Sequence, residues 1–228
     1  MDMLISSKTL QTQAYEVILD AICDGTLEPG QRLTQEDVAK RLNVSRQPIL
    51  SAFSTLKAQG FVQETGRRGL AVAPLNERFF KEIYEFRSAV EPLAVRLAIA
   101  NLDERTIASG RALIERGHAL ATAEDINGLL KADTDFHSFI YTVAGNSLIV
   151  ETMRLNWAHL RRCMREVLRL PHFLRGVWVE HEAILSAMER GDATAACAIM
   201  SDHLSAASDS VLPALEAKAA HAKLSGAE

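Results

Sequence analysis

The segment GTLEPGQRLTQEDVAKRLNVSRQPILSAFSTLKAQGFV, residues 25–62, predicts two short helices that follow each other almost at once. Thr34 is well placed to cap the first helix, because Asp37 follows three residues later as in a capping box. Ser45 is the expected N-cap of the second helix, and Gly60 is placed to end it. Two helices joined by so short a turn predict a helix-turn-helix.

The residues on either side extend this prediction to a complete small domain. Apolar residues recur at helical spacing from Thr9 to about Cys23, which predicts a helix before the pair. After Gly60, the segment FVQETGRRGLAV is typical of two short strands around a basic turn. We therefore expect residues 1–75 to form a winged helix-turn-helix domain with a small β-hairpin wing.

Polar side chains lie where such a domain would meet DNA. The second helix begins with Ser45, Arg46 and Gln47, and arginine and glutamine can read base edges in the major groove. The wing tip carries Arg67 and Arg68, which suit phosphates or a minor groove. Any one of these arginines could be an ordinary solvated charge. The ordered set favours DNA binding.

The distribution of charge is compatible with this interpretation, although the whole chain carries a net charge of −4. Residues 40–70 contain six lysine and arginine side chains against a single acidic one, Glu64. Residues 76–228 contain 17 basic and 21 acidic side chains, which accounts for the net charge. A basic stretch followed by an acidic domain is a plausible layout for a DNA-binding protein.

Composition and cysteine usage predict a cytoplasmic protein. The 228 residues are 48% hydrophobic and 24% charged, as in an ordinary soluble protein. The three cysteines are far apart and form no CxxC pair, which fits a reducing compartment. No apolar run approaches the roughly 20 residues that cross a bilayer, and the N-terminus lacks a signal-peptide pattern.

Residues 76–228 predict a second domain that is entirely helical. Alanine and leucine dominate the inner faces of successive helical patterns, which is typical of an antiparallel bundle. Gly145 is expected to end one helix, and Pro171 is expected in a connection between two others. The expected helices span about 77–100, 103–118, 124–144, 147–169, 174–190 and 193–215.

Four polar residues of this domain are candidates for a metal site. Asp133 and His137 are four residues apart, so they lie on the same side of one helix. His181 and His203 each have apolar neighbours at helical spacing, which predicts that they point inward. Three imidazoles and a carboxylate suit zinc above all, or nickel, manganese or iron, with positions left open for a ligand.

The same four residues have simpler explanations that the pattern leaves open. An inward histidine is more often a hydrogen-bonded core residue than a metal ligand. The pair of Asp133 and His137 could be a plain hydrogen bond within one helix turn. Convergence of all four residues would favour the metal, but the spacing along the chain does not show convergence.

Residues 10–75 resemble the DNA-binding domain of the GntR family of bacterial transcription regulators. The resemblance rests on the PG turn, on VSRQP at the start of the second helix and on LKAQGFV at its end. The family usually has arginine and then glutamate two and three residues after the proline, and the arginine helps to contact DNA. This chain has Leu50 and Ser51 at these positions, so one DNA contact usual in the family is missing. The operator sequence therefore does not follow from the resemblance.

Residues 80–212 resemble the ligand-binding FCD domain of the FadR subgroup of that family. The matching motifs are RSAVE from Arg87 to Glu91, DTDFH, GN, EHEAIL, GD and HL. In metal-binding members, the ligands occupy positions that correspond here to Asp133, His137, His181 and His203. The resemblance also implies that the domain senses a small organic acid, whose carboxylate can complete the coordination of the metal.

Two further residues are candidates for binding this effector. Arg87 could bind the carboxylate with two hydrogen bonds, or it could form a salt bridge with Glu91 on the helix surface. Asn146 could contact the effector, or it could only cap the helix that follows it.

The predicted function is that of a metabolite-responsive transcriptional regulator, and a repressor in particular. We expect a homodimer that binds a palindromic double-stranded DNA operator and no membrane. One alternative is a metal-dependent enzyme, although the chain lacks HExxH and any nucleophile motif. The other alternative is a regulator whose metal is purely structural.

Overall fold

The computed structural model describes residues 9–66, 69–167 and 171–225, and it divides into two compact units, Met1–Leu75 and Asn76–Glu228. The predicted fold class is confirmed: a winged helix-turn-helix with a small sheet and an all-helical second unit. Within the described residues, no helix has the length and apolar character that crossing a membrane requires.

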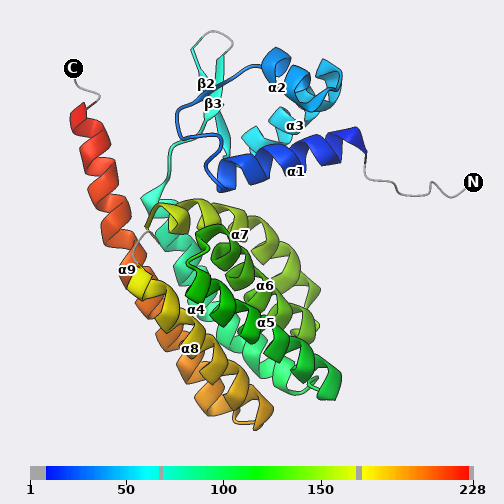
Figure 1. The fold of residues 1–228 in the computed structure, drawn as a ribbon, viewed down its shortest axis with the longest axis vertical. Coiled ribbons are helices and arrows are strands. Elements are labelled where there is room, and N and C mark those ends of the chain that lie inside the picture. The colour runs from blue at the N-terminus through cyan, green and yellow to red at the C-terminus, as the bar shows by residue number, and fades with distance from the viewer. Residues whose placement is uncertain (1–8, 67–68, 168–170, 226–228) are drawn as a thin grey trace, which may run out of the picture. The chain divides into compact units, whose positions relative to one another are not determined.

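The part of the first unit that the structure describes consists of three helices and a three-stranded antiparallel sheet, drawn in Figure 1. The strand order is β1-β3-β2, so the wing hairpin is extended by one strand that the sequence did not predict. This strand pairs Arg32 with Ala71 and Leu33 with Leu70, and two residues are too few to show an alternating pattern. The elements are α1 (Leu10–Cys23), β1 (Arg32–Leu33), α2 (Gln35–Leu42), α3 (Arg46–Ala58), β2 (Val62–Thr65) and β3 (Gly69–Val72).

The predicted cap Thr34 explains where α2 begins, whereas Ser45 occupies the N-cap position of α3 without a side-chain capping hydrogen bond. The Thr34 hydroxyl accepts a hydrogen bond from the backbone N–H of Asp37 at 3.1 Å, and donates one to the Asp37 carboxylate at 2.7 Å. Asn43 ends α2 in the left-handed conformation, with φ of 52°, which asparagine adopts more readily than most residues. The inner face of α3 is buried and packs against α1; its buried residues are Ile49, Ala52, Phe53 and Leu56.

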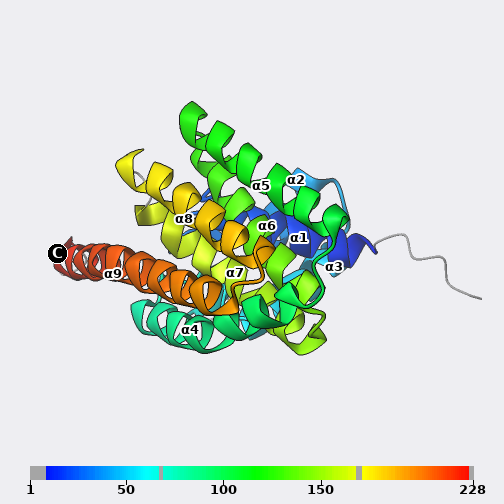
Figure 2. The ribbon, with the colours of Figure 1, turned by 90° about the horizontal axis from the view of Figure 1, so that it is seen from below.

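In its described residues, the second unit is a bundle of six helices; Figures 1 and 2 show them from two sides. Helix α9 lies along α4, which also packs against α6; α6 in turn contacts α5 and α7. Helix α8 packs between α5 and α9. The helices are α4 (Glu77–Ile99), α5 (Glu104–Ala123), α6 (Ile126–Ala144), α7 (Ser147–Val167), α8 (Pro171–Glu189) and α9 (Ala193–Ser225).

Two predicted boundaries in this unit are wrong: the place of Pro171, and the end of the helix expected over 103–118, which continues as α5 to Ala123. Pro171 is the first residue of α8 and does not lie in the connection, because a proline has no N–H to lose in the first turn of a helix. Helix α9 contains Pro213 and continues to Ser225, so the tail after residue 215, whose conformation the sequence left open, extends this helix. Gly145 ends α6 as predicted, with φ of +69°.

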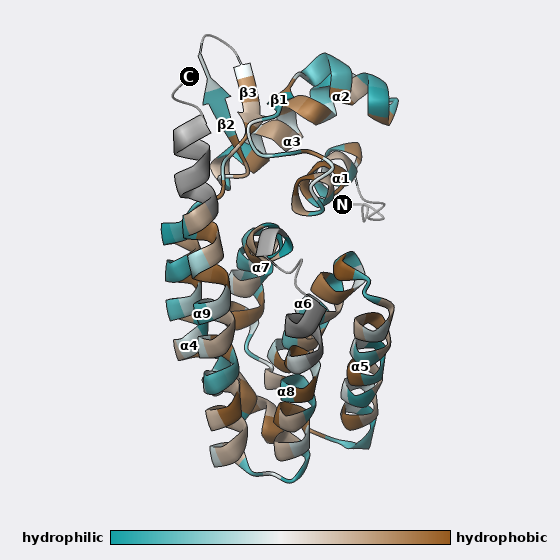
Figure 3. Cartoon of the chain, turned by 60° about the vertical axis from the view of Figure 1, so that its left-hand side comes forward, coloured by the Kyte–Doolittle hydropathy of each residue, from teal (hydrophilic) through white to brown (hydrophobic). Residues whose placement is uncertain are grey.

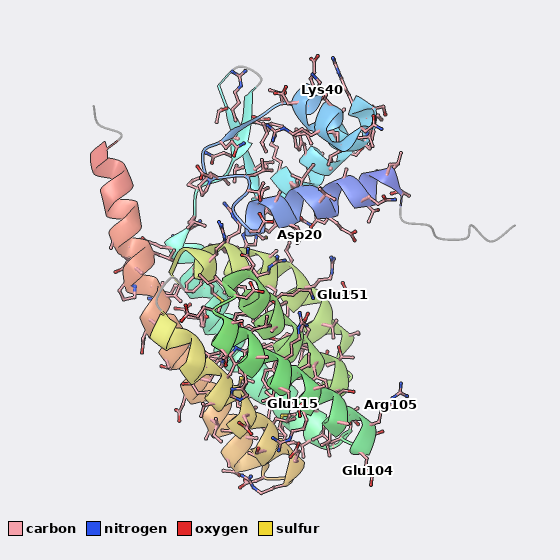
Figure 4. All side chains as sticks on the ribbon, viewed as in Figure 1. Asp20, Lys40, Glu104, Arg105, Glu115 and Glu151 are labelled. Carbon is pink, nitrogen blue, oxygen red and sulfur yellow. The ribbon has the colours of Figure 1, made fainter. Side chains whose placement is uncertain are left out.

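The core of the bundle is mostly apolar, and most charged side chains lie on its surface. In Figure 3, hydrophobic residues lie on sides of the helices that face one another. Glu104 and Arg105, at the start of α5, are exposed and point away from the bundle in Figure 4. Trp157 and Trp178 are both buried. Within this core the structure also buries a set of polar and charged residues, namely Arg87, Glu91, Asp133, His137, Arg162, His181 and His203.

Candidate metal centre

Four of these buried residues come from three helices and meet inside the bundle. Asp133 and His137 lie on α6, His181 on α8 and His203 on α9, and we call them the Asp-His cluster. One potential ligand atom from each residue lies within 4.8 Å of those of the other three. No more than 6% of any of the four residues is exposed, so the cluster is closed off from bulk solvent.

The carboxylate of Asp133 faces two of the imidazoles. Its Oδ1 lies 3.3 Å from Nε2 of His181 and 3.8 Å from Nε2 of His137. The ring centroids of these two histidines are 5.2 Å apart and their planes are nearly perpendicular, at 82°. The two Nε2 atoms and the carboxylate oxygen therefore border the same small space.

The third imidazole is oriented by a carboxylate outside the cluster. Nδ1 of His203 lies 2.7 Å from Oε2 of Glu180, on α8. A carboxylate at Nδ1 favours the tautomer that carries its proton there. Nε2 is then left as the acceptor nitrogen of His203, which is the form a metal requires.

A buried acid lies beside His137 in a similar way. Oε2 of Glu91 is 2.7 Å from Nδ1 of His137, while its Oε1 accepts hydrogen bonds from Nε of Arg87 at 2.5 Å and from the Tyr141 hydroxyl at 2.7 Å. Burial alone would raise the pKa of Glu91, but Arg87 and His137 hold that pKa well below its usual value. Glu91 is therefore an anion in the core, and it connects Arg87 with His137.

Arg87 forms the predicted salt bridge with Glu91, but inside the bundle and not on its surface. Only 1% of its side chain is exposed, and its guanidinium lies 4.6 Å from the ring centre of Trp157 and 4.9 Å from that of Tyr84. Its Nη2 is 3.4 Å from Nε2 of His137. The guanidinium therefore borders the space that the Asp-His cluster surrounds.

The chemistry of these side chains fits a divalent metal. Burial, reinforced by His203 and His137, lowers the pKa of His181 well below its usual value, and burial also lowers that of His137. Neutral imidazoles are the form that coordinates a metal. Among the described residues, neither ring nitrogen of His181 has a hydrogen-bond partner, which is costly in a core unless an ion is bound.

The structure places Asn146 at the start of α7. Its side-chain oxygen accepts hydrogen bonds from the backbone N–H groups of Leu148 at 3.1 Å and Ile149 at 3.3 Å. These are the contacts of a helix cap. None of its described contacts reaches the Asp-His cluster.

Three of the five predicted DNA contacts lie together at the start of α3. Ser45 is the N-cap residue, and Arg46 and Gln47 follow it, all three exposed to solvent. Arg46 is 3.0 Å from the Glu36 carboxylate of α2. The other two predicted contacts, Arg67 and Arg68, lie outside the described residues.

Sequence reasoning overlooked the two acids that support the histidines. Glu91 could have been suspected from its spacing to Arg87, but the contact with His137 joins residues 46 positions apart. Glu180 gave no signal, because its partner His203 belongs to the next helix. Two other acids that lie close to the cluster along the chain face elsewhere: Asp135 pairs with Arg116 at 3.0 Å, and Glu182 lies 3.3 Å from His118.

Comparison with known proteins identifies both units. Residues 10–72 match the family described as bacterial regulatory proteins, gntR family, and residues 82–206 match the FCD domain. The chain is 28% identical over 164 residues to the HTH-type transcriptional regulator YdhC of Bacillus subtilis, which covers 72% of this chain and 68% of the relative. It is 24% identical to the HTH-type transcriptional repressor RspR of Escherichia coli, over 90% of both chains.

A solved structure has the same architecture. The crystal structure of a GntR transcriptional regulator from Rhodococcus sp. RHA1 is similar with a TM-score of 0.78 and 27% sequence identity, over 89% of this chain and 97% of that one. These relatives are transcriptional regulators and not enzymes, which confirms the predicted class of protein. Because the two family matches fall on the winged helix-turn-helix and on the helical bundle that holds the Asp-His cluster, this chain belongs to the GntR family of DNA-binding transcriptional regulators and carries an FCD domain.

Proposed function

We propose that this regulator is a metabolite-responsive repressor whose helical unit binds a divalent transition metal and a small carboxylic acid. The observation that carries the proposal is the Asp-His cluster: four potential ligand atoms from three helices within 4.8 Å of one another, in a buried space. Three imidazoles and one carboxylate form a donor set that zinc accepts readily, and nickel, manganese and iron also use it.

Each residue has a defined role in this proposal. Asp133, His137, His181 and His203 hold the metal. Glu180 keeps the ring of His203 in place through Nδ1, as carboxylates commonly do for metal-bound histidines. The metal supplies open coordination positions for an oxygen of the effector.

Arg87 is the residue that would recognise the effector's carboxylate. Glu91 accepts a hydrogen bond from its Nε, and its Nη2 faces Nε2 of His137 at the edge of the cluster. Because Nη2 lies 3.4 Å from His137 Nε2, one carboxylate could contact both the arginine and the metal. Such a charge-assisted contact inside a closed space is strong and selects acids.

The DNA-binding half of the proposal rests on the winged unit. Ser45, Arg46 and Gln47 stand at the start of the helix that would enter the major groove, and Arg67 and Arg68, which fall between β2 and β3 in the sequence, would be the contacts of the wing. A homodimer would place two such helices about 34 Å apart on a palindromic operator. We infer repression because RspR, a relative over 90% of both chains, is a repressor by name.

The effector acts only if it binds two states of the protein with different affinity. A state that binds the acid well and the operator poorly would release the DNA when the acid is present. Purified protein should therefore lose operator affinity in the presence of the correct acid, and the metal-free protein should not respond.

Elemental analysis is the first test of the proposal. The wild type should contain about one transition metal per chain, and Asp133→Ala and His181→Ala should each lose it. Asp135→Ala and His118→Ala are matched controls, because these residues on α6 and α5 are partly exposed and pair with residues outside the cluster, and both variants should keep the metal. A wild type without metal, when purified without chelators, contradicts the proposed site.

The effector half is tested separately. A panel of small carboxylic acids is screened for a shift in melting temperature and for release of a fluorescent operator duplex, with the metal-loaded and the chelated protein. The proposal expects at least one acid to act only on the loaded form. A chelated protein that melts earlier but responds equally to an effector would make the metal structural.

A further inference from the structure

Helix α3 exposes a leucine on the side that carries its polar DNA-reading residues. Leu50 is 45% exposed, although its neighbour Ile49 is fully buried. At about 100° per residue, Leu50 lies within about 60° of both Arg46 and Gln47 around the helix axis. Leu50 therefore lies at the border between this polar side and the packed face of α3, because the buried Phe53 is also about 60° from it, on the side opposite Gln47.

Leu50 also borders a groove between α3 and the wing. The groove has a volume of about 420 Å³, and α3 lines it with Leu50, Ser54 and Lys57. The hairpin lines the opposite side with Glu64 and Leu70, among others. An aliphatic side chain thus stands at the border of a groove that opens beside the reading side of the helix.

The charges near Leu50 are already engaged within the protein. Lys57 forms a salt bridge with Glu64 at 2.5 Å, across the groove from α3 to β2. Arg46, one turn before Leu50, lies 3.0 Å from Glu36. At the position of Leu50 itself, the helix offers only an apolar contact, because leucine neither donates nor accepts a hydrogen bond.

The base edges in the major groove of DNA offer one apolar group that a leucine side chain could contact. Among the four bases, only thymine carries a methyl group at its major-groove edge, at C5. We propose that Leu50 determines part of the operator sequence by packing against a thymine methyl in each half-site. This inference needs the DNA-binding activity of the family and is independent of the metal and the effector.

The test begins with the DNA sequence that the full-length protein selects from a random duplex library. Each thymine of the selected site is then replaced in turn by uracil, which removes the methyl group and keeps every hydrogen-bonding group. We expect one position per half-site at which this replacement weakens binding by about fourfold, the value of one buried methyl group.

Variants of the leucine connect that position to Leu50. Leu50→Ala should bind the thymine and uracil duplexes with nearly equal affinity, and Leu50→Met should retain the preference because it is also long and apolar. Val17→Ala, which truncates a residue of α1 that is 50% exposed, is the matched control and should keep the full preference. Since Leu50 is exposed, its variants should keep the wild-type melting temperature.

Two outcomes overturn the inference. One is that no uracil replacement changes the affinity of the wild type, or that the library yields no preferred sequence. The other is that Leu50→Ala weakens binding to every duplex equally and leaves the thymine-to-uracil ratio unchanged. In both cases the proposal of a metal and an acid effector is unaffected, because elemental analysis and the effector screen test it without this position.

Discussion

Gly117 of α5 lies directly against the indole of Trp178 in α8: a Cβ added to Gly117 would be 2.0 Å from Cε3 of that ring. The indole is buried and rigid, so it cannot move aside as the end of a flexible side chain could. The same ring meets His181 edge-on, with centroids 4.8 Å apart. The close approach of α5 and α8 therefore helps to place one member of the Asp-His cluster.

Gly117→Ala should destabilise the protein and weaken metal binding together. The added methyl overlaps the indole that contacts His181, and such overpacking costs about 1–3 kcal/mol. Denaturant unfolding gives the loss in stability, and metal content gives the effect on the cluster. Gly176→Ala is the control, because a Cβ at Gly176 in α8 meets nothing within 4 Å and should stabilise the helix by about 0.5–1 kcal/mol. Equal stability of the wild type and Gly117→Ala would contradict the packing described.

Glu180→Ala should lower metal affinity and leave the fold intact. Glu180 contacts Nδ1 of His203 and is itself 42% exposed, so its removal frees the imidazole ring without opening the core. Loss of such a supporting carboxylate typically reduces metal affinity about 10- to 100-fold, and partial exposure favours the lower end. Competition with a chromogenic chelator measures the affinity. Glu182→Ala, two residues further along α8, contacts His118 and Arg111 and should have wild-type affinity.

The buried pair of Arg87 and Glu91 should show strong coupling in a double-mutant cycle. Arg87→Met and Glu91→Gln each leave an unpaired polar partner in the core, and breaking a buried pair costs about 3–5 kcal/mol. The double variant should therefore lose much less stability than the sum of the single losses. Urea unfolding of the four proteins measures the coupling.

Helix α4 contains its own control for that cycle. Arg78 and Glu82 form an ion pair with the same i,i+4 spacing, with their nitrogen and oxygen 2.9 Å apart, but they lie on the surface. Their coupling should stay below about 1 kcal/mol. Similar coupling for the two pairs would show that burial contributes little to the strength of the pair in the core.

Glu64→Gln should strengthen DNA binding and make it more dependent on salt. The Lys57 ammonium holds the pKa of the Glu64 carboxyl below its usual value, so near pH 7 the pair is charged and the lysine is occupied. Removing the carboxylate frees Lys57 for a phosphate, which should steepen the slope of log affinity against log salt by about 0.9 per added contact. Fluorescence anisotropy between low and moderate salt measures the slope. Glu82→Gln, in the second unit, is the control and should leave the slope unchanged.

Local patterns in the sequence predicted most of the helices and strands and the division into two domains. Thr34 and Asp103 are residue types that favour the N-cap position, and in the structure each accepts a hydrogen bond from the backbone N–H three residues later. Gly145 ends α6 because glycine readily adopts the positive φ that this position requires. Such signals depend on neighbours within one turn, and these are visible in the sequence. The two-residue strand β1 was missed because its pairing with β3 joins residues nearly 40 positions apart.

The arrangement of the candidate metal centre could not be predicted from local patterns in the sequence. The apolar neighbours of His181 and His203 predict that both side chains point into the bundle. Helical periodicity does not show which residues of the other helices they contact there. Whether Asp133, on a third helix, approaches them to 3.3 Å depends on how α6, α8 and α9 pack across the core. Tertiary packing alone decided that the four ligand candidates converge, that Glu180 supports His203, and that Arg87 is buried. Each of these depends on contacts between helices, whose relative positions are set by the shape of the whole core and not by any one segment.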